Sequence, residues 1–121
     1  CPYISAAREY GISYIPLVSL TTSLNRAVDI SGTSTGFVYV TAVTGVTGVR
    51  KSISRTLPCF LKDLKSRSDK PLFVGFGISS REHIIGLKNF CDGFIVGSAV
   101  IEVIRSGKNI SKFLENLRSG L

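Results

Sequence analysis

The stretch PLFVGFGISS, residues 71–80, joins a short apolar run to an amphipathic segment through a glycine-rich turn. The apolar run at 71–75 is too short for a free-standing helix and is typical of a buried strand. The segment after the turn has the apolar spacing of a helix, at Ile84, Ile85, Leu87 and Phe90. The stretch therefore predicts a strand followed by a helix, with Ser79 and Glu82 forming a capping box at the helix start.

The same alternation recurs along the chain. Further β-rich apolar runs lie at 13–19, 36–42 and 93–97, and helical spacing occurs at 24–28, 57–64 and 110–117. Residues 4–10 are typical of the end of a helix closed by Gly11. Long connections between strands favour right-handed crossovers and a parallel sheet. Strands that are apolar on both faces must be buried by other elements on both faces. We expect an α/β fold: four parallel βα units, which are half of a (β/α)8 TIM barrel of about 250 residues.

Composition limits the classes of protein that remain. The 121 residues are 44% hydrophobic, which predicts one partial-barrel domain over 1–121. The absence of methionine indicates a piece of a longer protein. No membrane span or signal peptide is predicted. Three widely spaced cysteines predict neither a disulfide framework nor a metal site. The net charge of +7 is spread along the chain, so we expect no nucleic-acid interface.

Glycines follow two neighbouring strands at the edge of the sheet where parallel α/β folds bind ligands. Gly75, Phe76 and Gly77 follow the run at 71–75, while Gly97 and Ser98 close the run at 93–97. Backbone amides at such turns approach a ligand closely, and a helix start adds partial positive charge. The pattern predicts a phosphate site, helped by a short extra helix at 99–104. The alternative for each glycine is a tight turn or a helix cap.

The segment VTGVTGVRKSISRT, residues 43–56, is longer than most loops that join a strand to a helix. Gly45, Thr47 and Gly48 offer hinges, hydroxyl groups and backbone donors, which predicts a lid over the site. A surface loop without function is the alternative.

Groups for proton transfer are scarce at the strand ends. The aspartates nearest to strands, Asp29, Asp63 and Asp92, fall on helices or before a strand. Acid–base chemistry must then come from Tyr39 or from outside this chain, and Tyr39 could equally be a core aromatic. We expect an exposed, non-catalytic position for His83 and core or surface positions for the three cysteines.

Three stretches, GFVYVTAVTGVTGVR, PLFVGFGISS and DGFIVGSAV, closely resemble the C-terminal half of tryptophan synthase alpha subunits, and the resemblance covers essentially the whole chain. It implies a carbon–carbon lyase that cleaves indole-3-glycerol phosphate to indole and glyceraldehyde 3-phosphate. The alpha subunit of this family uses no cofactor. Indole passes to a beta subunit, which carries pyridoxal phosphate, within an alpha2beta2 tetramer. The compartment implied is the cytoplasm or the plastid stroma.

The resemblance also implies roles for single residues. Gly48, Gly77, Gly97 and Ser98 would hold the substrate phosphate, and Phe76 and Tyr39 would line the pocket. Thr47 would latch the closed lid to a catalytic aspartate.

The family's catalytic glutamate and aspartate belong to the other half of the barrel. We therefore expect this chain to be inactive alone and to expose apolar surface at its outer strands. Two alternatives stay open: another phosphate-sugar enzyme on the same barrel, and a non-catalytic phosphate-binding module.

Overall fold

A single four-stranded sheet organises the chain. The structure is a computed structural model that describes residues 1–42 and 53–121. Its strands are β1 (Leu17–Val18), β2 (Val38–Thr41), β3 (Leu72–Gly75) and β4 (Gly93–Phe94). They lie in the order β1-β2-β3-β4 and every neighbouring pair is parallel. This arrangement confirms the α/β class and the parallel sheet predicted from the alternating pattern.

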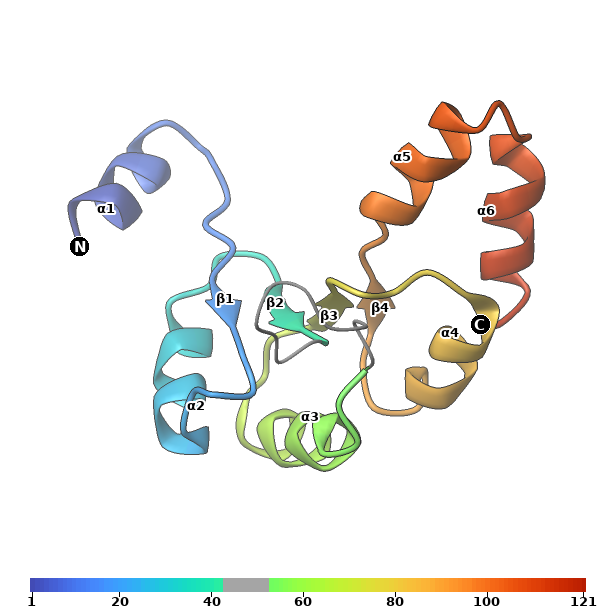
Figure 1. The fold of residues 1–121 in the computed structure, drawn as a ribbon. Helices are drawn as coiled ribbons and strands as arrows, with labels where there is room; N and C mark the ends of the chain where they lie inside the picture. The colour runs from blue at the N-terminus through green and yellow to red at the C-terminus, as the bar shows by residue number, and fades with distance from the viewer. Residues whose placement is uncertain (43–52) are drawn as a thin grey trace.

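Helices precede, separate and follow the strands. They are α1 (Pro2–Glu9), α2 (Leu24–Gly32), α3 (Leu57–Arg67), α4 (Arg81–Leu87), α5 (Ser98–Arg105) and α6 (Ile110–Arg118). Figure 1 shows α2, α3 and α4 following one another around the strands, with α1 at one end of the molecule and α5 and α6 at the other. The short extra helix expected at 99–104 is present as α5. Gly11 has a φ of 67°, as expected for the residue that closes α1.

The core lies between the sheet and these helices. Val38 and Val40 of β2 are fully buried, as are Leu72 and Val74 of the neighbouring strand. Helix α3 buries the residues of its apolar stripe, Leu57, Leu61 and Leu64. The alternate residues of the strands and the apolar stripe of α3 therefore pack together in one apolar layer.

The start of α4 differs from the predicted capping box by one residue. Ser80, not Ser79, is the N-cap residue, and its Oγ accepts a hydrogen bond from the backbone N–H of His83 at 3.4 Å. Glu82 lies one residue too early to complete the box. The sequence offered two consecutive serines, and the structure uses the second one as the cap.

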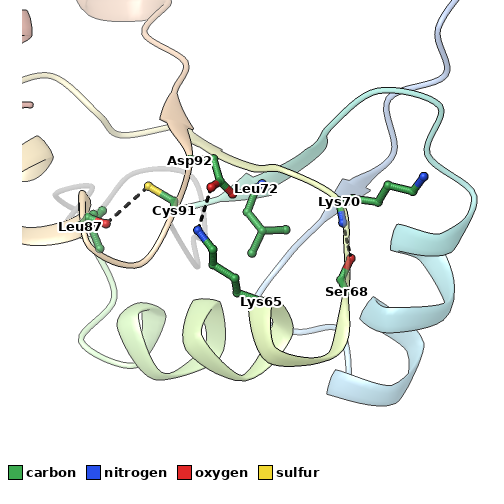
Figure 2. A network of polar contacts seen from close by, with 7 residues as sticks. All are labelled: Lys65, Ser68, Lys70, Leu72, Leu87, Cys91 and Asp92. Atoms are coloured by element: carbon green, nitrogen blue, oxygen red, sulfur yellow. Dashed lines mark hydrogen bonds and ion pairs between the residues drawn. The ribbon is translucent and has the colours of Figure 1, made fainter.

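A polar contact joins the amino ends of β3 and β4, at the edge of the sheet opposite to the turns (Figure 2). Asp92 accepts a hydrogen bond from the backbone N–H of Leu72 at 2.9 Å and one from Lys65 Nζ at 2.7 Å. Partial burial disfavours the charged carboxylate, but the bonds from Lys65 and Leu72 outweigh it and lower the pKa of Asp92. We infer a structural role for Asp92 because barrels carry stability contacts at this end.

The three cysteines occupy the positions expected of thiols without a chemical role. Cys1 and Cys59 are exposed, and Cys91 is buried. The Cys91 thiol donates a hydrogen bond to the carbonyl of Leu87 at 3.4 Å. Burial raises the pKa of Cys91 to about 11, so the thiol is unreactive at neutral pH.

Apolar surface remains at both outer strands. On β1, Leu17 is 55% exposed. Beside β4, a groove of about 350 Å³ is lined mainly by apolar side chains of β4, α4 and α6, among them Phe94, Ile84 and Leu117. This matches the expectation that half of a barrel leaves apolar surface at its two open edges.

Candidate phosphate-binding site

The face of the sheet opposite to the core shared with α3, called the open face below, carries a row of aromatic rings. Phe37 and Phe73 stack with their ring centroids 4.5 Å apart. Tyr39 pairs with Phe73 in the β2–β3 register, and all three side chains are only partly buried. The pattern alone could not tell which face of β2 was interior. The structure shows that the valines face the helices and Tyr39 lies on the open face.

The turn after β3 has an unusual backbone. Phe76 has a φ of 54° and Gly77 a φ of 86°, so two successive residues adopt the left-handed region. Glycine adopts this region freely, whereas phenylalanine does not. The conformation leaves the Phe76 side chain 58% exposed, with its ring 5.4 Å from that of Tyr39 and tilted by 47°.

The ring of Tyr39 lies next to Gly75, where this turn begins. A Cβ placed on Gly75 would lie 2.5 Å from Tyr39 Cζ, so any side chain at this position would force the tyrosine ring to shift. Partial burial raises the pKa of Tyr39 above its usual value, although a hydrogen bond with the Phe76 backbone acts in the opposite direction. Tyr39 therefore stays a neutral phenol at physiological pH. It can line a pocket or share a hydrogen bond there, but it is poorly suited to act as a base.

The second part of the candidate site follows β4. Strand β4 lies next to β3, and the bond from Ile95 N–H to the Val74 carbonyl, 2.8 Å long, extends their contact toward the carboxyl end. Gly97 is the N-cap residue of α5, and no side chain caps this helix. The first amides of α5 can therefore serve an anion. A Cβ on Gly97 would meet no atom of the described residues within 4 Å, so these residues leave the space above it open.

These observations bring part of the predicted site together. Gly75 is the last residue of β3, and Phe76 and Gly77 follow it. Gly97 and Ser98 come after β4, the parallel strand next to β3. The predicted lid residues Gly45, Thr47 and Gly48 lie outside the described residues.

Within the two described segments, no aspartate or glutamate lies in a strand or in the turns at 76–79 and 95–97, although Glu82 lies in the first turn of α4. Asp29 lies in α2, Asp63 in α3, and Asp92 precedes β4, as the sequence analysis placed them. No group of three histidine, cysteine or acidic side chains suited to a metal ion occurs among residues 1–42 and 53–121. Over the same residues, no helix is long and apolar enough to cross a membrane.

The contact that His83 makes near the site was not predicted from the sequence. His83 was expected to be exposed, but it is half-buried, and its Nδ1 accepts a hydrogen bond from the backbone N–H of Ser79 at 3.2 Å. The available signal was its position three residues after a serine, where a side chain can reach back to the segment before a helix.

Known proteins of one family resemble this chain over nearly its whole length. A family model described as "Tryptophan synthase alpha chain" matches residues 1–119. The chain belongs to the tryptophan synthase alpha chain family. The curated tryptophan synthase alpha chain of Caldicellulosiruptor saccharolyticus is 44% identical over 118 residues, and that of Alkaliphilus metalliredigens is 44% identical over 117 residues. The chain spans 46% and 44% of the length of these two relatives.

Solved structures of the tryptophan synthase family agree with this assignment. A mutant tryptophan synthase alpha-subunit from Pyrococcus furiosus superposes with a TM-score of 0.81 at 31% identity, covering 98% of this chain and 49% of that one. A Mycobacterium tuberculosis tryptophan synthase gives 0.78 at 30% identity, covering 98% of this chain and 46% of that one. The four βα units are thus half of a tryptophan synthase alpha chain TIM barrel, which confirms the fold and the family inferred from the three quoted stretches.

Proposed function

We propose that this chain is the phosphate-binding half of an alpha subunit that cleaves indole-3-glycerol phosphate to indole and glyceraldehyde 3-phosphate. Residues 1–121 would form one partial-barrel domain of that lyase. The reaction is a retro-aldol cleavage that needs no cofactor in the alpha subunit. The proposal rests on family membership together with one observation: the left-handed turn at Phe76 and Gly77 and the uncapped start of α5 follow neighbouring strands.

In this proposal the substrate phosphate binds backbone amides of Gly77, Gly97 and Ser98. Two or three amide donors suit a phosphate dianion, and the open space above Gly97 leaves room for its oxygens. Gly75 would act indirectly, by leaving room for Tyr39. Gly48 would add a donor from the lid that also contains Gly45 and Thr47, as the resemblance implies.

The remaining parts of the substrate would meet the open face of the sheet. Phe76 presents an exposed ring beside Tyr39, and both offer apolar surface to an indole. The acid and base would come from the other half of the barrel, since the described residues place no carboxylate in the strands or in the turns that directly follow β3 and β4. A beta subunit with pyridoxal phosphate would receive the indole in an alpha2beta2 assembly, in the cytoplasm or the plastid stroma.

A pair of substitutions at Gly97 tests the phosphate site. We expect Gly97→Ala to fold like the original chain, because a methyl group meets no other described residue there, and to bind indole-3-glycerol phosphate more weakly, because the methyl group enters the space left for the phosphate oxygens. Gly97→Asp should bind at least 100-fold more weakly, since a carboxylate repels the phosphate and fills its place.

Binding is measured by amide chemical shifts of the 15N-labelled chain, which also report whether each variant is folded. Equal affinity of a folded Gly97→Asp variant would remove Gly97 from the site. Stronger binding of another phosphorylated sugar than of indole-3-glycerol phosphate would favour a different enzyme on the same barrel.

A further inference from the structure

Two hydrogen bonds of opposite direction tie the first turn of α4 to the segment before it. Ser80 Oγ accepts the backbone N–H of His83 at 3.4 Å, and His83 Nδ1 accepts the backbone N–H of Ser79 at 3.2 Å. The first bond is an ordinary helix cap. The second lies outside the helix and holds the end of the turn that begins at Gly75.

The turn that begins at Gly75 has an unfavourable backbone conformation, which other contacts must stabilise. Phe76 and Gly77 both have positive φ values, and a left-handed phenylalanine costs free energy that the surrounding structure must offset. Tyr39 contacts the beginning of the turn at Gly75, and buried Ile78, 3% exposed, anchors its middle. His83 is the side chain that fixes its end.

The bond from Ser79 places a chemical requirement on residue 83. Nδ1 must carry a lone pair, so the ring is the neutral tautomer with its hydrogen on Nε2. A glutamine at the third position of a helix can also reach back with a side-chain oxygen and accept the same N–H, whereas alanine cannot.

We propose that His83 is a positioning residue for the phosphate-binding turn, acting through the Ser79 amide without touching the substrate. By fixing Ser79, it helps to keep Gly77 in the left-handed conformation, from which the Gly77 amide would bind the phosphate in the proposed function. This inference rests on the proposed function, because the turn is part of the phosphate site only if that function holds.

Three variants of the 121-residue chain test the inference. His83→Ala removes the acceptor, and His83→Gln replaces it. Asn109→Ala is the matched control: the Asn109 side chain accepts the backbone N–H of Lys112 at 3.0 Å, so its loss also removes one hydrogen bond from a backbone N–H to a side chain, away from the site. Each 15N-labelled chain is titrated with glycerol 3-phosphate, and thermal unfolding is recorded in parallel.

We expect His83→Ala to weaken phosphate binding about threefold to tenfold, the effect of one lost hydrogen bond, and His83→Gln to restore it to within twofold. Asn109→Ala should lower the melting temperature and leave binding unchanged. Long-range 1H–15N spectra of the original chain should show a histidine with hydrogen on Nε2 and none on Nδ1.

The outcomes separate the two proposals. If the amides of Gly77, Gly97 and Ser98 in the original chain do not respond to the ligand, the proposed phosphate site is wrong. If they respond and His83→Ala binds as well as the original chain, only the role of His83 is wrong. A histidine with hydrogen on Nδ1, or equal weakening in His83→Ala and Asn109→Ala, would also overturn that role.

Discussion

The ring of Tyr39 occupies the space into which any side chain at position 75 would project. A Cβ on Gly75 would lie 2.5 Å from Cζ and 2.8 Å from Cε1 of Tyr39, well inside normal contact distances. A backbone position on β3 and a side chain on β2 are therefore coupled across the candidate site.

Gly75→Ala should destabilise the chain by about 1–3 kcal/mol, because the methyl group overpacks against the Tyr39 ring. Tyr39→Ala in the same chain should relieve the clash, giving a coupling free energy of about 1 kcal/mol or more in a double-mutant cycle from urea unfolding. Tyr39→Phe is the control. It removes the hydroxyl oxygen, which is the nearest atom, but keeps Cζ and Cε1 in place, so it should relieve the clash only in part. Additive effects of Gly75→Ala and Tyr39→Ala would show that the two residues do not compete for space.

Asp92→Asn should lower the free energy of unfolding at pH 7 by about 1 kcal/mol. The ion pair between Asp92 and Lys65 is partly exposed and contributes little, but the negative charge also strengthens the hydrogen bond from the Leu72 amide. The pKa of Asp92 is lowered in the folded chain, so its stabilisation is present above the unfolded pKa of about 3.9 and is lost as the pH falls further, through the folded pKa. Urea unfolding of both chains from pH 7 to pH 2.5 should show the difference shrinking below about pH 4. A difference that stays constant over this range would show that the charge of Asp92 is not the cause.

The rate of alkylation should distinguish the buried Cys91 from the two exposed cysteines. Burial raises the pKa of Cys91 to about 11, so at pH 8 only on the order of one Cys91 thiol in a thousand is ionised. Iodoacetamide should therefore label the exposed Cys1 and Cys59 within minutes and Cys91 only after urea is added. Mass spectrometry of peptides counts the labels at each time. Labelling of Cys91 at the rate of Cys59 would mean that α4 and β4 do not pack together in solution.

The 121-residue chain should not release indole from indole-3-glycerol phosphate. The described residues place no carboxylate at the carboxyl ends of the strands, and Tyr39, with its raised pKa, is a poor base. Indole release is followed by a colorimetric assay beside a heat-denatured sample of the same chain. Turnover above that background would show that the acid and base lie within these residues, contrary to the proposed division between the two halves.

The order of the elements could be predicted from the sequence because it depends on local periodicity. Runs such as 36–42 and 71–75 are too short and too apolar to be anything but buried strands, and the stripe of Leu57, Leu61 and Leu64 has the period of a helix. Their number and spacing indicated half of a parallel barrel. The glycines at the ends of two neighbouring strands located the candidate site for the same reason, since parallel strands end at one edge.

The details at that edge depend on contacts between distant parts of the chain. Which face of β2 carries the core follows from the packing of α2 and α3, and no alternation within β2 contains that information. The preference for glycine at position 75 comes from the Tyr39 ring on another strand, and Ser80 rather than Ser79 caps α4, which two consecutive serines in the sequence could not indicate. Local propensity thus determined the elements and their order, whereas tertiary packing decided which atoms meet at the site, because steric exclusion and hydrogen-bond geometry act between residues that the sequence keeps far apart.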